Sequence, residues 1–140
     1  MLKQVSIFLE NKAGRVYSIM ETLAEAQINV RAMTIAETAE FGIVRIIVCD
    51  PERAKSVLRE NNFTVKTTEV VGVTIPDKFG ALCDVLRLFS QNNINIEYSY
   101  SLMGCTHGNA NILIRVNEPE KAELILSNAG VKLITPDEIV

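Results

Sequence analysis

Two short segments of the chain combine residue types that can bind a small charged molecule. They are Glu10-Asn11-Lys12-Ala13-Gly14 and Pro76-Asp77-Lys78-Phe79-Gly80, and each stands between a predicted strand and a predicted helix. The first backbone N–H groups of a helix are unpaired and lie at the positive end of its dipole, so they suit a carboxylate. A glycine lets a ligand approach that backbone closely. The same glycines can also serve only a tight turn, and the residue types leave both interpretations open.

These two segments belong to an internal repeat, which decides the domain organisation. The loop glycines lie 66 positions apart, whereas the last matching segments lie 68 positions apart, so the second copy carries two additional residues between Ile96 and Ile112. Two copies are too few for a solenoid, and we predict two small domains, residues 1–70 and 71–140. The other matching segments are Ile28-Asn29-Val30 with Ile94-Asn95-Ile96, and Asp50-Pro51-Glu52-Arg53-Ala54 with Glu118-Pro119-Glu120-Lys121-Ala122.

The hydrophobic pattern predicts the same order of elements in each copy: strand, helix, strand, strand, helix, strand. In the first copy, residues 5–9 alternate, residues 16–24 recur at helical spacing, and Asp50 is placed to cap a helix that begins at Pro51. This order predicts an α+β protein of two ferredoxin-like domains, each an antiparallel sheet with both helices on one face. We expect the last strand of the first copy to run directly into the second copy, and residues 131–134 to close the second sheet. The residues predicted to face the core from the first helix of the second copy are Leu82, Val85, Leu86 and Phe89.

Composition excludes several classes of protein. The net charge is −3 and the pattern holds no basic stripe, so we expect no nucleic-acid partner. No apolar run approaches the ~20 residues that span a bilayer, so we expect neither a membrane anchor nor a signal peptide. The three cysteines, an odd number without paired spacing, indicate a reduced, cytoplasmic protein.

The sequence offers little for catalysis or for a metal. Cys105 and His107 are two soft ligands in a predicted turn, but a closed zinc site needs about four. We find no nucleophile with a base and no phosphate-binding motif, so we predict no catalytic residues, no metal and no cofactor. Tyr98 and Tyr100 could stack RNA bases in a sheet of this topology, yet the acidic charge favours a packing role at a domain or subunit surface.

The ordered repeat resembles the ACT domain, a small ligand-binding module of amino-acid metabolism, and more narrowly the stand-alone proteins with two ACT domains in tandem. The resemblance covers nearly the whole chain twice, and it rests on the loop ending in glycine and on the Ile-Asn-Ile or Ile-Asn-Val start of the second strand. The second copy, with Pro76-Asp77-Lys78-Phe79-Gly80-Ala81-Leu82, is nearer to the family pattern. The first copy departs from it, because Asn11 stands in place of the usual acid, Ala13 where proline is common and Val16 where leucine is common.

The resemblance implies where a ligand binds. ACT domains pair side by side with their sheets continuing across the interface, and the pocket uses the loop of one domain with the second strand of its neighbour. One implied site combines Asn11, Lys12, Ala13, Gly14 and Arg15 with Ile94, Asn95 and Ile96. The other combines Asp77, Lys78, Phe79, Gly80 and Ala81 with Ile28, Asn29 and Val30.

Three hypotheses on function follow from these observations. The leading one is a non-catalytic regulatory protein that binds a small L-amino acid between the two domains and acts as a sensor or on an enzyme of amino-acid metabolism. The second is an interaction module, or a regulatory subunit, without a small-molecule ligand. A small enzyme that uses the cleft between the copies is the third, and the lack of a catalytic motif argues against it. Because edge strands of such sheets are exposed, we also expect a homodimer.

Overall fold

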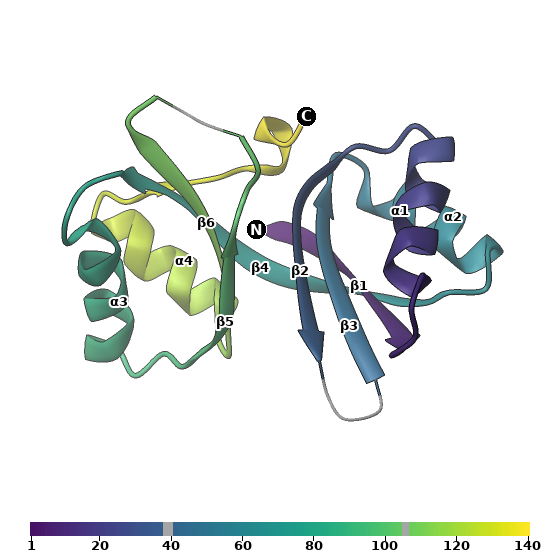
Figure 1. Cartoon of the computed structure of the whole chain (residues 1–140). Coiled ribbons are helices and arrows are strands. Elements are labelled where there is room, and N and C mark those ends of the chain that lie inside the picture. The colour runs from purple at the N-terminus through teal and green to yellow at the C-terminus, as the bar shows by residue number, and fades with distance from the viewer. Residues whose placement is uncertain (38–40, 105–106) are drawn as a thin grey trace. The chain divides into compact units, whose positions relative to one another are not determined.

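The computed structural model describes residues 1–37, 41–104 and 107–140, and it is an α+β structure with two compact units (Figure 1). The N-terminal unit comprises Lys3–Thr68 with Ile139–Val140. The C-terminal unit comprises Glu69–Glu138 with Met1–Leu2. Each unit repeats the order of elements that the hydrophobic pattern predicts, so the predicted fold class of two ferredoxin-like units is confirmed.

The N-terminal unit is an antiparallel sheet packed against two helices. β3 lies between β1 and β2 and is antiparallel to both, and β4 lies next to β1. Its elements are β1 (Leu2–Glu10), α1 (Arg15–Glu25), β2 (Val30–Glu37), β3 (Phe41–Val48), α2 (Pro51–Glu60) and the first residues of β4 (Thr64–Pro76). β4 is a single strand that continues into the second copy, as the sequence predicts.

The C-terminal unit repeats this arrangement with one short strand. β6 pairs with both β4 and β5, and β7 lies on the other side of β4. Its elements are the remainder of β4, α3 (Ala81–Gln91), β5 (Ile96–Ser101), β6 (Asn109–Val116), α4 (Pro119–Asn128), β7 (Lys132–Leu133) and a short 3₁₀ helix (Pro136–Glu138). The predicted closing strand 131–134 is therefore only two residues long, because the left-handed Gly130 precedes it and Pro136 soon follows it.

The two additional residues of the second copy lie in the hairpin between β5 and β6. Ile35 faces Val44 in the first hairpin, and Ser101 faces Ile112 in the second. Ile35 and Ser101, on the first strand of each hairpin, are 66 positions apart, whereas Val44 and Ile112, on the second strand, are 68 positions apart. The insertion therefore falls between Ser101 and Ile112. The ladder on either side keeps the same register in both units.

Each unit has its own hydrophobic core between helices and sheet. In the N-terminal unit, Ile19 and Leu23 from α1 pack with the inward residues of the strands. In the C-terminal unit, Val85 and Phe89 from α3 do the same, as predicted. The prediction for Leu82 and Leu86 is wrong: they are 43% and 37% exposed. The reason is that Ala81, Val85 and Leu88, offset along the helix, form the face that α3 turns to the core.

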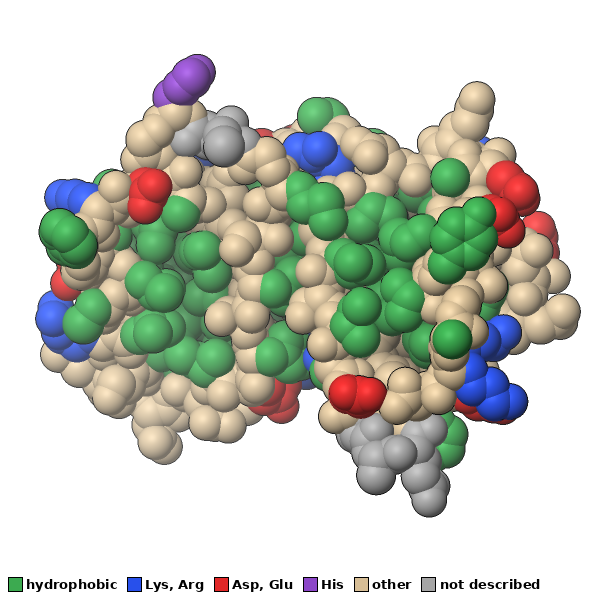
Figure 2. Space-filling model, viewed as in Figure 1, with side chains coloured by type: hydrophobic (Ala, Val, Ile, Leu, Met, Phe, Trp, Pro, Cys, Tyr) green, Lys and Arg blue, Asp and Glu red, His purple; other side chains and the backbone are tan. Residues whose placement is uncertain are grey.

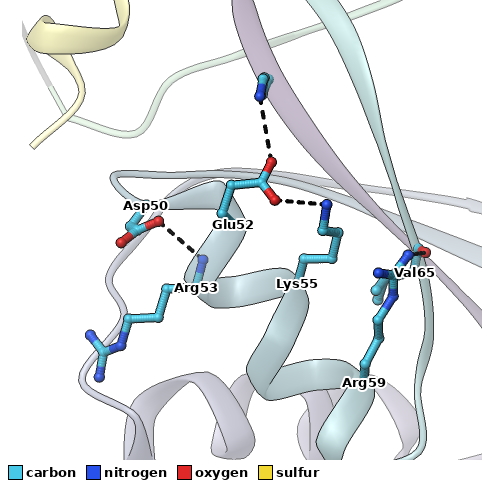
Figure 3. A network of polar contacts seen from close by, with 7 residues as sticks. Asp50, Glu52, Arg53, Lys55, Arg59 and Val65 are labelled. Atoms are coloured by element: carbon cyan, nitrogen blue, oxygen red, sulfur yellow. Dashed lines mark hydrogen bonds and ion pairs between the residues drawn. The ribbon is translucent and has the colours of Figure 1, made fainter.

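The N-terminus of α2 confirms the predicted cap. The Asp50 side chain accepts a hydrogen bond of 3.0 Å from the backbone N–H of Arg53, and Pro51 occupies the first turn (Figure 3). Glu52 and Lys55 form an ion pair of 2.7 Å on the same helix. The equivalent residue of α4, Glu118, makes no such cap bond in the part of the chain that the structure describes.

Candidate functional site

The two predicted ligand loops fold in the same way at the starts of α1 and α3. Gly14 and Gly80 precede these helices with φ of +86° and +84°, a left-handed conformation that L-residues other than glycine rarely adopt. In both loops the lysine N–H donates to the carbonyl two residues before it, at 2.9 Å for Lys12 and 3.0 Å for Lys78. The turn that the glycines were expected to allow is thus present in both copies.

Each loop presents backbone N–H groups without partners. Within the described ranges, the N–H groups of Ala13 and Gly14 donate no hydrogen bond, and neither do those of Phe79 and Gly80. These groups lie at the positive end of a helix, and residues 11–14 and 77–80 are all exposed. The loops therefore have the donors that a carboxylate would need.

The side chains of the N-terminal loop are already occupied. Asn11 donates a hydrogen bond of 2.8 Å to Glu37 at the end of β2, and Lys12 forms an ion pair of 2.7 Å with Glu10. The Lys12 ammonium lowers the pKa of the Glu10 carboxyl below its ordinary value, first through their hydrogen bond and then through their charges. Arg15 makes a different contact, because its guanidinium lies 5.3 Å from the centre of the Phe63 ring.

The C-terminal loop leaves the matching side chains unpaired. Pro76 stands where the first copy has Glu10, so Lys78 lacks the equivalent of the carboxylate that pairs with Lys12. In the described part of the chain, the side chains of Asp77 and Lys78 make no hydrogen bond or ion pair. Phe79 is fully exposed, at 106% of its reference area. This loop therefore offers one free carboxylate and one free ammonium beside the free N–H groups.

The predicted strand residues sit alike in both units. Ile28 and Ile94 are buried at the end of the preceding helix, whereas Asn29 and Asn95 are exposed. The backbone of Asn95 is held by Asn117, whose side-chain Oδ1 accepts from the Asn95 N–H at 3.0 Å. Cys49 stands at the position of Asn117 in the first copy, so the two strand starts are not equivalent. The remaining predicted strand residues, Val30 and Ile96, are half-buried.

The loop and strand halves of each implied site belong to different units. Residues 11–15 lie in the N-terminal unit and residues 94–96 in the C-terminal unit, and the second site divides in the opposite sense. That the halves meet to form a pocket stays a prediction. The sequence did not predict that Glu37 and Glu10 pair with the side chains of Asn11 and Lys12, because the contact of Asn11 with Glu37 depends on where the β2–β3 hairpin ends.

The described residues hold no group of three or more histidine, cysteine or acidic side chains that could bind a metal. Cys105, one of the two soft ligands considered above, lies outside the described residues. Cys49 and Cys83 are free and exposed. Among the described helices, none has the length and hydrophobicity that crossing a membrane requires.

Comparison with known proteins agrees with this geometry. A family model described as an ACT domain pair matches residues 1–139. The chain belongs to the ACT domain family. A crystal structure of a protein from Bacteroides thetaiotaomicron is 42% identical, with a TM-score of 0.92, over 99% of this chain and 94% of that one. A search of curated proteins gave no match.

Structures with lower sequence identity share the fold. The ligand-free regulatory subunit of aspartate kinase from Thermus thermophilus is 13% identical, with a TM-score of 0.62 over 91% of this chain and 92% of that one. The corresponding subunit from Thermus flavus is 15% identical, with a TM-score of 0.60 over 93% and 92%. At such identities the likeness shows a common fold for this ACT pair.

Proposed function

We propose that this ACT pair is a non-catalytic regulatory protein that binds a small L-amino acid. The observation that carries the proposal is the C-terminal loop, where free backbone N–H groups at the start of α3 lie beside the unpaired side chains of Asp77 and Lys78. An α-amino acid carries one carboxylate and one ammonium group. The N–H groups of Phe79 and Gly80 would hold the carboxylate, and Asp77 would hold the ammonium.

The exposed asparagines at the strand starts complete the proposed sites. Asn29 would add an amide from the N-terminal unit to the loop of residues 77–81, and Asn95 would do the same for the loop of residues 11–15. The occupied side chains of Asn11 and Lys12 must leave Glu37 and Glu10 before they can contact a ligand. We therefore propose that the site with Asp77 binds more tightly than the site with Asn11.

The edges of the sheets support the proposed homodimer. In the described part of each unit, β2 and β5 are end strands with a neighbour on one side only. Each unit has exposed large hydrophobic residues, which include Ile35 on β2 and Leu82 and Leu86 on α3. Figure 2 shows that hydrophobic side chains reach the surface of the protein. Unpaired strand edges and exposed apolar side chains each favour association.

We further propose an enzyme of amino-acid metabolism as the protein that this pair regulates, in the cytoplasm. Two structural neighbours are regulatory subunits of aspartate kinase, which supports a role as a subunit that acts on a separate catalytic chain. The cysteine pattern supports a reducing compartment.

A second function, an interaction module without a small ligand, is favoured by one observation. Phe79 is fully exposed at the tip of the C-terminal loop. Leaving a phenylalanine in water forgoes about 1.5–3 kcal/mol of burial, so a partner chain that covers it would gain that free energy. The amino-acid hypothesis uses the same residue differently, as an apolar cover over a bound ligand.

A thermal-shift screen separates the two functions. We expect one or a few of the standard L-amino acids, at millimolar concentration, to raise the melting temperature, because a ligand that binds only the folded state stabilises it. A ligand at about ten times its Kd adds about 1.4 kcal/mol, which corresponds to a few degrees. The D-enantiomer of each active compound is the control. An unchanged melting temperature with every amino acid would favour the interaction module.

A further inference from the structure

A pocket of about 610 Å³ lies within the C-terminal unit, away from the strand starts that the proposed amino-acid sites use. It opens between α3, the end of β4 and the turn that joins α4 to β7. Ile75 and Val85 are buried at its base, and Leu88 and Val131 are half-buried beside them. The pocket therefore has an apolar floor large enough for a small organic molecule.

The internal repeat shows why this space is open. Ala81 in the pocket corresponds to Arg15 in the first copy, 66 positions earlier, and Val131 corresponds to Phe63, 68 positions earlier. In the N-terminal unit these two larger side chains stack on each other, with the guanidinium 5.3 Å from the ring centre. Two small residues in the C-terminal unit leave vacant the volume that two large ones occupy in its repeat.

The rim of the pocket carries an excess of positive charge. Lys78, Arg87 and Lys132 line it together with a single carboxylate, Asp84, in a chain whose net charge is −3. Asp84 is engaged by Arg87 at 3.0 Å. Lys132 lies 3.5 Å from Glu138, which does not line the pocket. A cluster of cations around an apolar floor attracts an anion with a hydrophobic body.

We propose that this pocket binds a small carboxylic acid with a branched or aromatic apolar body. The body would pack on Val85, Leu88 and Val131, and the carboxylate would lie near Lys132 and Lys78. An α-ammonium group would meet no free carboxylate there, because Arg87 already holds Asp84. The pocket thus selects against the amino acids proposed for the loops.

This inference goes beyond the proposed function and does not depend on it. The pocket shares Lys78 and Ala81 with the loop of the amino-acid site, whereas Leu88, Val131 and Lys132 belong to the pocket alone. Ligand binding to the pocket is therefore measured at these three residues. If either site does not bind its proposed ligand, the other can still be tested.

The experiment is a titration of the full ¹⁵N-labelled chain with 4-methylpentanoate, followed by amide chemical shifts. We expect saturable shifts at Leu88, Val131 and Lys132. The uncharged 4-methylpentanamide, which has the same branched body, tests the need for charge, and L-leucine tests the effect of an ammonium group. Both should bind at least about threefold more weakly.

Two variants test the assignment of the site. Ala81→Arg combined with Val131→Phe restores the pair found in the first copy and should weaken binding at least about tenfold, because it fills the pocket. Lys132→Gln removes the charge of an exposed side chain, together with its contact with Glu138, and should weaken binding about threefold. The control Lys66→Gln, at an exposed lysine of the N-terminal unit, should not weaken it.

Several results would overturn the proposal. They are the absence of saturable shifts at the three pocket residues, equal binding of the amide, or undiminished binding by the doubly substituted chain with a folded spectrum. If that chain does not fold, Lys132→Gln decides: an affinity equal to that of Lys66→Gln would reject the site.

Discussion

Gly14 and Gly80 each begin a helix with a positive φ, and no atom lies within 4 Å of where a Cβ would stand. Strain in the backbone, not lack of space, therefore sets the effect of a substitution. We expect Gly14→Ala and Gly80→Ala each to lower the free energy of unfolding by about 1–2 kcal/mol, measured by urea denaturation.

Gly42 is the matched control for these two glycines. A Cβ there would lie 3.8 Å from Leu9 Cγ, an ordinary contact, and its φ is not positive. Gly42→Ala should leave stability within about 0.5 kcal/mol of the wild type or raise it. Equal losses at Gly42 and Gly80 would contradict an origin in backbone strain.

The ion pair between Glu52 and Lys55 makes a pH-dependent contribution at the residue scale (Figure 3). The hydrogen bond and charge of Lys55 lower the pKa of the Glu52 carboxyl, and Lys3 adds a smaller effect. A carboxyl whose pKa is lowered on folding stabilises the protein above its ordinary pKa, and this stabilisation is lost as the pH falls through the folded value.

We therefore expect Glu52→Gln to be less stable than the wild type at neutral pH, with a difference that shrinks as the pH falls from the ordinary pKa of a glutamate through the lowered folded pKa of Glu52. Urea denaturation of both proteins at neutral pH and at about pH 3 measures this. A difference that stays constant or grows on acidification would show that the Lys55 contact does not stabilise the folded state.

At the scale of elements, the two second helices differ at their N-caps. Asp50 caps α2 through its side chain, whereas Glu118, its repeat equivalent, makes no cap bond at α4 among the described residues. We expect Asp50→Ala to cost about 1 kcal/mol, and Glu118→Ala less than half of that. Thermal unfolding of the two variants compares them directly, and a Glu118→Ala loss as large as that of Asp50→Ala would contradict the difference in capping.

The elements themselves were largely predictable from the sequence. Alternation and helical spacing, the glycine before each first helix and the Asp-Pro start of α2 depend on neighbouring residues, so local physics determines them. The position of the insertion also followed from the two offsets of the repeat.

The wrong burial prediction and the contacts that were not predicted depend on packing between segments far apart in the sequence. The exposure of Leu82 and Leu86 depends on how α3 is rotated over the sheet, and helical spacing alone did not determine that rotation. The pairing of Asn11 with Glu37 and the stacking of Arg15 on Phe63 join residues from different elements. No pattern along the chain could show that these contacts make the first loop and the second loop different.

At the scale of the whole molecule, duplication produced two ACT units with the same fold and unequal surfaces. In the first unit, Glu10 and Glu37 pair with side chains of the loop, and Phe63 packs against the Arg15 guanidinium. In the second unit, a pocket lies where the equivalents of Phe63 and Arg15 stand, and the matching loop side chains have no such partners among the described residues. The proposed difference between the two ligand sites rests on this inequality, because only the loop of the C-terminal unit has unpaired charged side chains among the described residues. Regulation of a partner enzyme would then depend on how a bound ligand changes the stability of that unit.

The measurement that tests the central claim most directly is isothermal titration calorimetry of the standard L-amino acids into the full chain and two variants. We predict saturable heat for one or a few of them, an affinity at least about tenfold weaker for Asp77→Ala, and an affinity within about twofold of the wild type for Asn11→Ala. Saturable binding that both variants lose equally would contradict the unequal roles of the loops. No saturable heat with any amino acid would contradict the claim that this ACT pair binds one.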